Sequence, residues 1–110
     1  MTYAEVESMI ASADIPTAYY QFPDGTEQRT PFICFFYPDS RDVYADNSNY
    51  QKIEHLVIEL YTDNKDFAAE AAVEAALRDH GLTWTRSEAW LGSERMQEVI
   101  YETDVVITEE

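Results

Sequence analysis

The stretch Tyr50-Gln-Lys-Ile-Glu-His-Leu-Val-Ile-Glu-Leu-Tyr-Thr62 decides the fold, because it is the clearest β-strand of the chain. Ile53, Val57 and Tyr61 alternate with Leu56, Ile58 and Leu60, and side chains two residues apart point to the same face of a strand. The polar positions of the stretch are Glu54, His55 and Glu59. We predict a strand over residues 50–62 and place the remaining elements outward from it.

A helix is expected directly after this strand, from about Asp66 to His80. Gly81 follows at the position where helices commonly stop. The alanines of this segment indicate close packing of the helix on a sheet. The apolar stripe comprises Ala69, Ala72, Val73, Ala76 and Leu77, and the opposite edge, expected to be solvated, comprises Asp66, Glu70, Glu74 and Arg78.

The chain before this strand predicts one helix and two strands. A capping box, Thr2-x-x-Glu5, begins a helix expected from about Tyr3 to Ala13. Strands are expected over residues 17–22 and 32–37, and the unbroken apolar run of the second indicates burial on both faces. Residues 38–49 are polar and predict a long loop of the kind that is often functional.

Two more strands are expected after the second helix, over residues 82–90 and 96–107. On the last strand one side comprises Gln97, Val99, Tyr101, Thr103, Val105 and Ile107, and the other, strongly acidic side comprises Glu98, Ile100, Glu102 and Asp104. The order is then α-β-β-β-α-β-β. Short connections favour antiparallel neighbours. We predict a single α+β domain over residues 1–110, with a mainly antiparallel four- to five-stranded sheet and both helices on one face.

Charge excludes several classes of function. The 110 residues include 22 Asp and Glu against 7 Lys and Arg, which gives a net charge of −15. A protein that binds nucleic acid through its phosphates, or docks on an anionic membrane, needs the opposite balance. No apolar run approaches the roughly 20 residues of a membrane span. The single cysteine allows no internal disulfide, so we expect an acidic, soluble, intracellular protein.

Residues that could carry catalysis are few. His80 falls at a helix end, where a cation is favourable, and His55 falls within a strand with no orienting partner that the sequence identifies. Cys34 lies among apolar residues and is expected to be a small buried hydrophobe. Asp46-x-Ser48 could begin a calcium loop but lacks the glycine at its sixth position. We therefore predict no enzyme, no catalytic residue, no cofactor and no metal, although a pocket ringed by perturbed residues would indicate a ligand-binding enzyme.

Aromatic residues are more informative. The chain has 2 Trp, 8 Tyr and 5 Phe, and several fall in loops or at strand ends: Tyr37, Tyr44, Tyr50, Trp84 and Trp90. Such residues can cap a small core. They also anchor protein–protein interfaces, which favours an assembly subunit.

Several segments occur in a recognisable order along nearly the whole chain. They are Tyr19-Tyr20-x-Phe22-Pro23-Asp24-Gly25-Thr26, Pro31-Phe32-Ile33, Ala45-Asp46-Asn47, Glu59-Leu60-Tyr61-Thr62-Asp63 with Lys65-Asp66, and Glu98-Val-Ile-Tyr101-Glu102. In this order and spacing the chain resembles the small tail-terminator proteins of long-tailed phages and prophages, also labelled tail-completion, head–tail joining or minor capsid proteins. None of the segments is a catalytic signature.

The resemblance implies a virion protein whose copies form a ring, typically a hexamer, at the head-proximal end of the tail. Such a ring stops tube polymerisation and joins the head, so its partners would be other copies, the tail tube protein and head–tail connector proteins. The resemblance implies no cofactor, and it implies a place in the host cytoplasm before assembly. The residues expected in interface loops are Phe22, Pro23, Asp24, Gly25, Tyr44, Asp46 and Asn47.

The acidic side of the last strand has two interpretations. Glu98, Glu102 and Asp104 would face a channel through which DNA passes without specific binding, because a negative wall repels phosphates. Alternatively, they keep the subunit soluble before assembly. A different class of function is an acidic DNA mimic or host-enzyme inhibitor of phage origin, although the carboxylates are spread along the chain instead of lying on one element.

Overall fold

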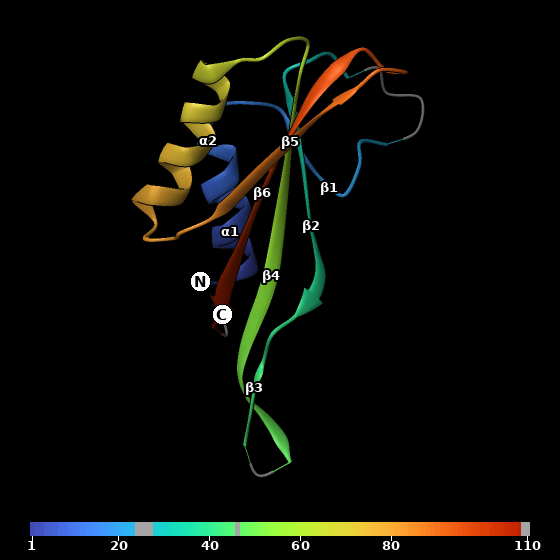
Figure 1. Cartoon of the computed structure of the whole chain (residues 1–110). Coiled ribbons are helices and arrows are strands. Elements are labelled where there is room, and N and C mark those ends of the chain that lie inside the picture. The colour runs from blue at the N-terminus through green and yellow to red at the C-terminus, as the bar shows by residue number, and fades with distance from the viewer. Residues whose placement is uncertain (24–27, 46, 109–110) are drawn as a thin grey trace.

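Two helices cover one face of a twisted sheet in the computed structural model, which describes residues 1–23, 28–45 and 47–108 (Figure 1). The elements are α1 (Tyr3–Ala11), β1 (Thr17–Tyr19), β2 (Phe32–Ser40), β3 (Val43–Ala45), β4 (Ser48–Thr62), α2 (Phe67–Asp79), β5 (Thr85–Leu91) and β6 (Met96–Ile107). The strand order is β1-β2-β4-β6-β5, with β3 paired to β4. The strand predicted over residues 50–62 is therefore central, as β4.

Local sequence signals explain both helix starts. At α1, Glu5 N–H donates to Thr2 Oγ1 over 3.1 Å, and Thr2 N–H donates to Glu5 Oε1 over 2.8 Å, which completes the predicted capping box. At α2, Asp66 accepts from the Ala69 N–H. Gly81 ends α2 with φ +74°, a left-handed conformation that glycine adopts without steric cost. Helix α1 ends at Ala11, two residues before its predicted end.

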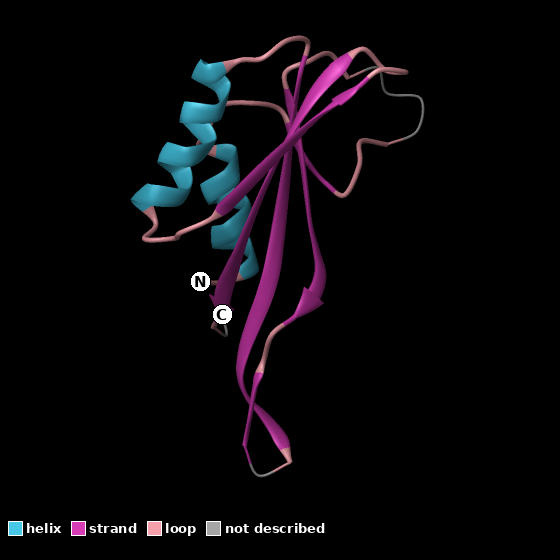
Figure 2. Ribbon diagram, in the orientation of Figure 1, coloured by secondary structure: helices cyan, strands magenta, loops and turns pink. Residues whose placement is uncertain are grey.

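The core lies between the helices and one face of the sheet. Leu56, Ile58 and Leu60 of β4 are at most 1% exposed and face the helices, as their alternation predicts. The side of β6 that was expected to be apolar also turns inward. The helices contribute Val6, Met9, Ile10, Ala69, Val73, Ala76 and Leu77, and the flanking strands contribute Ile33, Phe35, Val99, Tyr101 and Val105. The prediction that both helices share one face is confirmed (Figure 2).

One edge of α2 is not solvated as predicted. Glu70 is only 5% exposed, because Lys65, just before α2, and Arg86 of β5 lie beside it. Lys65 Nζ lies 2.9 Å from the Glu70 carboxylate, and Arg86 of β5 lies 3.6 Å from it. Tyr101 of β6 also donates to Glu74 over 2.9 Å. These polar contacts join α2 to the edge of the sheet.

The sheet differs from the prediction in strand number and in one pairing. It has six strands instead of four or five, because a strand, β3, forms inside the expected loop, and the order becomes α-β-β-β-β-α-β-β. β1 pairs with β2 in parallel, whereas an antiparallel neighbour was expected. β1 ends at Tyr19, not at residue 22, because Tyr20 takes φ +66° and leaves the extended conformation. β5 begins at Thr85, not at residue 82.

The segment predicted as a long loop, residues 38–49, is instead part of a projecting β-arm. β2 continues to Ser40 through an irregularity between Phe36 and Asp39, and β3 pairs with the start of β4. We call residues 38–45 and 47–52 the β-arm. It extends away from the helices, and the molecule measures 49 × 29 × 24 Å (Figure 1). Its polar composition suggested a loop because a two-stranded ribbon in solvent buries neither face.

Candidate functional site

The sheet face turned away from the helices, which we call the open face, gathers most of the chemically active side chains. It is defined by alternation, because the neighbours of the helix-facing residues along each strand point the other way. Its members are Phe32, Cys34 and Phe36 of β2, His55, Val57, Glu59 and Tyr61 of β4, and Glu98, Ile100, Glu102 and Asp104 of β6.

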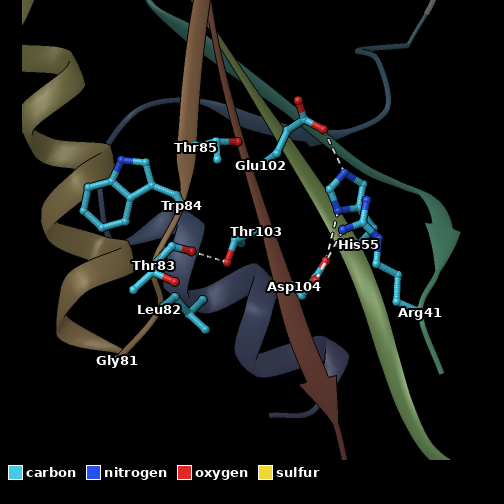
Figure 3. Close-up of a pocket in the computed structure, with 10 residues that line it drawn as sticks. All are labelled: Arg41, His55, Gly81, Leu82, Thr83, Trp84, Thr85, Glu102, Thr103 and Asp104. Carbon is cyan, nitrogen blue, oxygen red and sulfur yellow. Dashed lines mark hydrogen bonds and ion pairs between the residues drawn. The ribbon is translucent and has the colours of Figure 1, made fainter. Parts of the chain in front are cut away.

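His55 lies between two carboxylates on this face (Figure 3). Its Nε2 is 2.8 Å from Glu102 Oε1, and its Nδ1 is 3.1 Å from Asp104 Oδ1. Arg41, at the base of the β-arm, approaches Asp104 to 3.5 Å. The register explains the cluster, since Asp104 is directly opposite His55 and Glu102 is opposite the neighbouring Val57.

This arrangement favours the protonated imidazole. Burial of His55 lowers its pKa, but the hydrogen bonds to Asp104 and Glu102 outweigh that effect, so its pKa is raised above the usual value. Each ring nitrogen needs a proton to donate to its carboxylate. Neither nitrogen is then free to take a proton from a substrate. The cluster is therefore suited to holding β4 and β6 together, not to general base catalysis.

A solvent-open hollow of about 500 Å³ lies beside the cluster (Figure 3). Its far side is formed by the segment that leads into β5, including Thr83 and Trp84. The Thr103 hydroxyl donates to the Thr83 carbonyl over 2.6 Å and holds that segment against β6. The hollow thus combines an ion-pair network with a polar wall.

A second cluster on the open face consists of two carboxylates and one phenol. The Tyr61 hydroxyl lies 2.8 Å from Glu98 Oε2 and 3.1 Å from Glu59 Oε1. Burial and the negative charge of Glu98 raise the pKa of Glu59. Burial and the same glutamate raise the pKa of Tyr61. Within the described part of the chain, no Lys, Arg or His forms an ion pair with either carboxylate.

The remaining residues considered for catalysis take structural positions. Cys34 is 6% exposed, which confirms that it is a buried hydrophobe, and burial together with Glu59 raises the pKa of its thiol. A raised pKa disfavours the nucleophilic thiolate. His80 caps the end of α2, with Nδ1 2.8 Å from the Ala76 carbonyl. In residues 1–23, 28–45 and 47–108, no group of three or more His, Cys, Asp or Glu is placed to hold a metal ion.

The three acidic residues predicted to face a channel do lie on one face, as alternation along β6 required. Each has a partner inside the subunit, which the sequence did not reveal: Tyr61 for Glu98, and His55 for both Glu102 and Asp104. The partners are distant in sequence and become neighbours only through the register of β4 and β6. The sequence showed the acidic pattern of the last strand, but it did not show which side chains these carboxylates contact.

The predicted interface residues separate into two groups at opposite ends of β4 (Figure 1). Phe22 packs its ring 5.7 Å from that of Phe32, which pairs with the end of β4, and Pro23 follows it as an exposed residue. Tyr44 and Asn47 are exposed in the β-arm beside the start of β4. Tyr44 is 72% exposed. The predicted residues Asp24, Gly25 and Asp46 lie outside the described residues.

Among the described residues, no helix has the length and apolar character needed to cross a bilayer.

Comparisons with known proteins identify a shared fold. No family model and no curated protein matches the sequence. A solved structure described as "Virion of native gene transfer agent (GTA) particle" contains a chain of similar fold, with a TM-score of 0.61. The match covers 94% of this chain and 90% of that chain, at 17% sequence identity. The likeness therefore spans the helices, the sheet and most of the connecting segments, and it shows that the two chains share a fold.

Proposed function

We propose that this protein is a structural subunit of a tailed phage-like particle, where copies of it form a ring at the head-proximal end of the tail. The ring would end the tail tube and join it to the head. The observation that carries the proposal is the fold shared with a chain of a gene transfer agent virion over 94% of the present chain. The ordered segments that resemble tail-terminator proteins support the specific place in the particle.

The shape of the subunit suits an assembly role. A closed ring needs two different contact surfaces on each subunit, so that one copy binds the next head to tail. The β-arm provides a protruding surface with Val43 and Tyr44 exposed, at 45% and 72%. Other large exposed side chains lie away from the arm, including Tyr20, Phe67 and Trp90. Aromatic side chains of this kind are favoured contact residues in interfaces.

The chemistry of the open face supports a role without catalysis. Both nitrogens of His55 are engaged by carboxylates, and Cys34 is a buried thiol. A DNA mimic would need carboxylates free to meet a basic cleft, whereas Glu102 and Asp104 are already paired with His55 within the subunit. We therefore favour the virion role over the inhibitor. That these three carboxylates line the DNA channel stays a prediction.

Electron microscopy of a disrupted gene tests the proposal. An early stop codon is introduced in the genome that encodes the chain, and a synonymous change at the same codon serves as the control. The proposal predicts filled heads beside unattached, overlong tails in the stop-codon lysate, and intact particles in the control. Detached tails of normal length would support joining but contradict length control. Intact, normal particles in the stop-codon lysate would contradict the virion role itself.

A further inference from the structure

The open face is unusually apolar for a sheet face that no described helix covers (Figure 2). An antiparallel sheet with one solvated face normally alternates apolar and polar residues. Here Phe36 and Ile100 are partly exposed on that face, and Cys34 and Val57 between them are 6% and 7% exposed. Adjacent cross-strand rows thus form an apolar strip that runs diagonally across β2, β4 and β6, broken by Glu59 between Cys34 and Ile100.

Two carboxylates lie in or beside this strip, and no cation of the described residues balances them. Glu59 lies between Cys34 and Ile100 in one row, and Glu98 lies opposite Tyr61 in the next. Tyr61 has one hydroxyl proton and can donate it to only one of the two glutamates at a time. At the other end of the same face, His55 and Arg41 balance Glu102 and Asp104. Among the described residues, the negative charge of the open face is therefore unbalanced around Glu59 and Glu98.

We propose that the open face around Glu59 and Glu98 binds a basic segment of a different virion protein, which places a lysine or arginine side chain between the two carboxylates. Apolar side chains of that segment would cover Ile100 and the part of Phe36 that the Tyr20 ring, 5.6 Å away, leaves exposed. The inference rests on the proposed function for the identity of its partner as a virion protein. A guanidinium or ammonium group supplies several donors and therefore satisfies both glutamates together.

Charge determines which occupant fits. A second copy of the chain brings a net charge of −15, and symmetric pairing through this face would set Glu59 and Glu98 against the same residues of the partner. Nucleic acid is excluded by the same sign of charge. A basic polypeptide is attracted by the whole subunit and by the local pair. Burial and the charge of Glu98 raise the pKa of Glu59 in the free subunit. A cation bound beside Glu59 would lower that pKa again, because it favours the charged carboxylate.

The first test uses the isolated protein and a defined peptide with alternating lysine and valine residues. Binding is followed by NMR, with a peptide of alternating glutamate and valine as the negative probe. The lysine peptide is expected to shift resonances of Cys34, Val57 and Ile100. The double variant Glu59→Gln with Glu98→Gln keeps the side-chain shape and should weaken binding by about tenfold. No binding, or binding that this variant does not weaken, would overturn the proposal.

A matched double variant controls for net charge. Glu7→Gln with Asp79→Asn also removes two carboxylates, but both residues are exposed on the helices, on the other side of the sheet. It should bind the lysine peptide as the unchanged protein does. Equal weakening in both double variants would mean that binding follows overall charge and not this face, which contradicts the proposal.

The second test examines purified particles by carbodiimide chemistry and mass spectrometry. Glu59 and Glu98 are expected to be less reactive in particles than in the free subunit, and to form zero-length crosslinks to lysines of another protein where the partner uses lysine. The covered position proposed for Glu98 is an alternative to its place on the DNA channel, so unchanged reactivity would favour the channel and overturn the inference. Crosslinks to a second copy would also overturn it. Absence of the chain from particles would refute the proposed function, and the peptide test would still decide the inference.

Discussion

At the scale of single residues, folding moves the His55 imidazole from water to a buried position between two carboxylates. Folding places it 8% exposed between Glu102 and Asp104. Its folded pKa is raised above the unfolded value, which is about 6.5. The folded state therefore holds the imidazole proton more tightly than the unfolded state does. The resulting stabilisation is complete below the unfolded pKa and is lost as the pH rises through the folded pKa.

We predict that the free energy of unfolding decreases as the pH rises above the unfolded imidazole pKa of about 6.5, and that His55→Gln flattens this dependence. At pH 6 the variant should be less stable by about 2 kcal/mol, because it loses hydrogen bonds to charged groups. Urea denaturation at a series of pH values measures both effects. His80→Gln, which alters the exposed imidazole at the end of α2, is the control. A variant with the same pH dependence as the unchanged protein would show that the His55 cluster does not stabilise the fold.

The partners of His55 illustrate what residue patterns can and cannot reveal. Alternation along the chain correctly placed Glu102 and Asp104 on one side of β6, and His55 was recognised as a polar position within β4. Which of these side chains meet depends on the register of the two strands, and nothing local to either strand specifies it. The contact of Arg41 with Asp104 could not be predicted either, because the segment that carries Arg41 was expected to be a loop.

At the scale of elements, β4, α2 and β6 could be predicted because each carries a regular apolar pattern over its length. Their apolar periodicity is strong, and caps such as Asp66 and Gly81 mark the ends of α2. The parallel pairing of β1 with β2 is a tertiary property that short strands do not encode. The β-arm was missed because it buries little, so it has no apolar period to detect.

The β-arm also provides a prediction that separates assembly from stability. Val43→Ser with Tyr44→Ser should leave the melting temperature of the subunit almost unchanged, because no described residue of the arm belongs to the buried core. The same substitutions should reduce the yield of intact particles, because they remove the exposed apolar contacts of the arm. Circular dichroism and particle counts by electron microscopy measure the two quantities.

A core substitution provides the comparison. Leu56→Ala, at a residue that is 0% exposed, should lower the free energy of unfolding by about 3 kcal/mol. It should reduce particle yield only through loss of folded subunit. If the arm variant assembled at the normal yield, the arm would not be a contact surface.

At the scale of the whole molecule, the subunit combines an acidic body with a projecting arm. The net charge of −15 could be read from the sequence, and it excludes binding of DNA through phosphate contacts. The elongated shape of the subunit could not be predicted from the sequence, because it arises from the β-arm. Repulsion between free subunits is screened beyond about 8 Å at physiological salt. A ring of such subunits therefore depends on short-range contacts and on basic partners.

The most direct test of the virion role is a cryo-electron microscopy reconstruction of the head–tail junction in purified particles, combined with mass spectrometry of their proteins. We predict that the chain is present and that its density forms a ring between the tail tube and the head. Each subunit of that ring should show two helices on one face of the sheet and a projecting β-arm. Intact, infectious or DNA-filled particles that lack the chain would contradict the account.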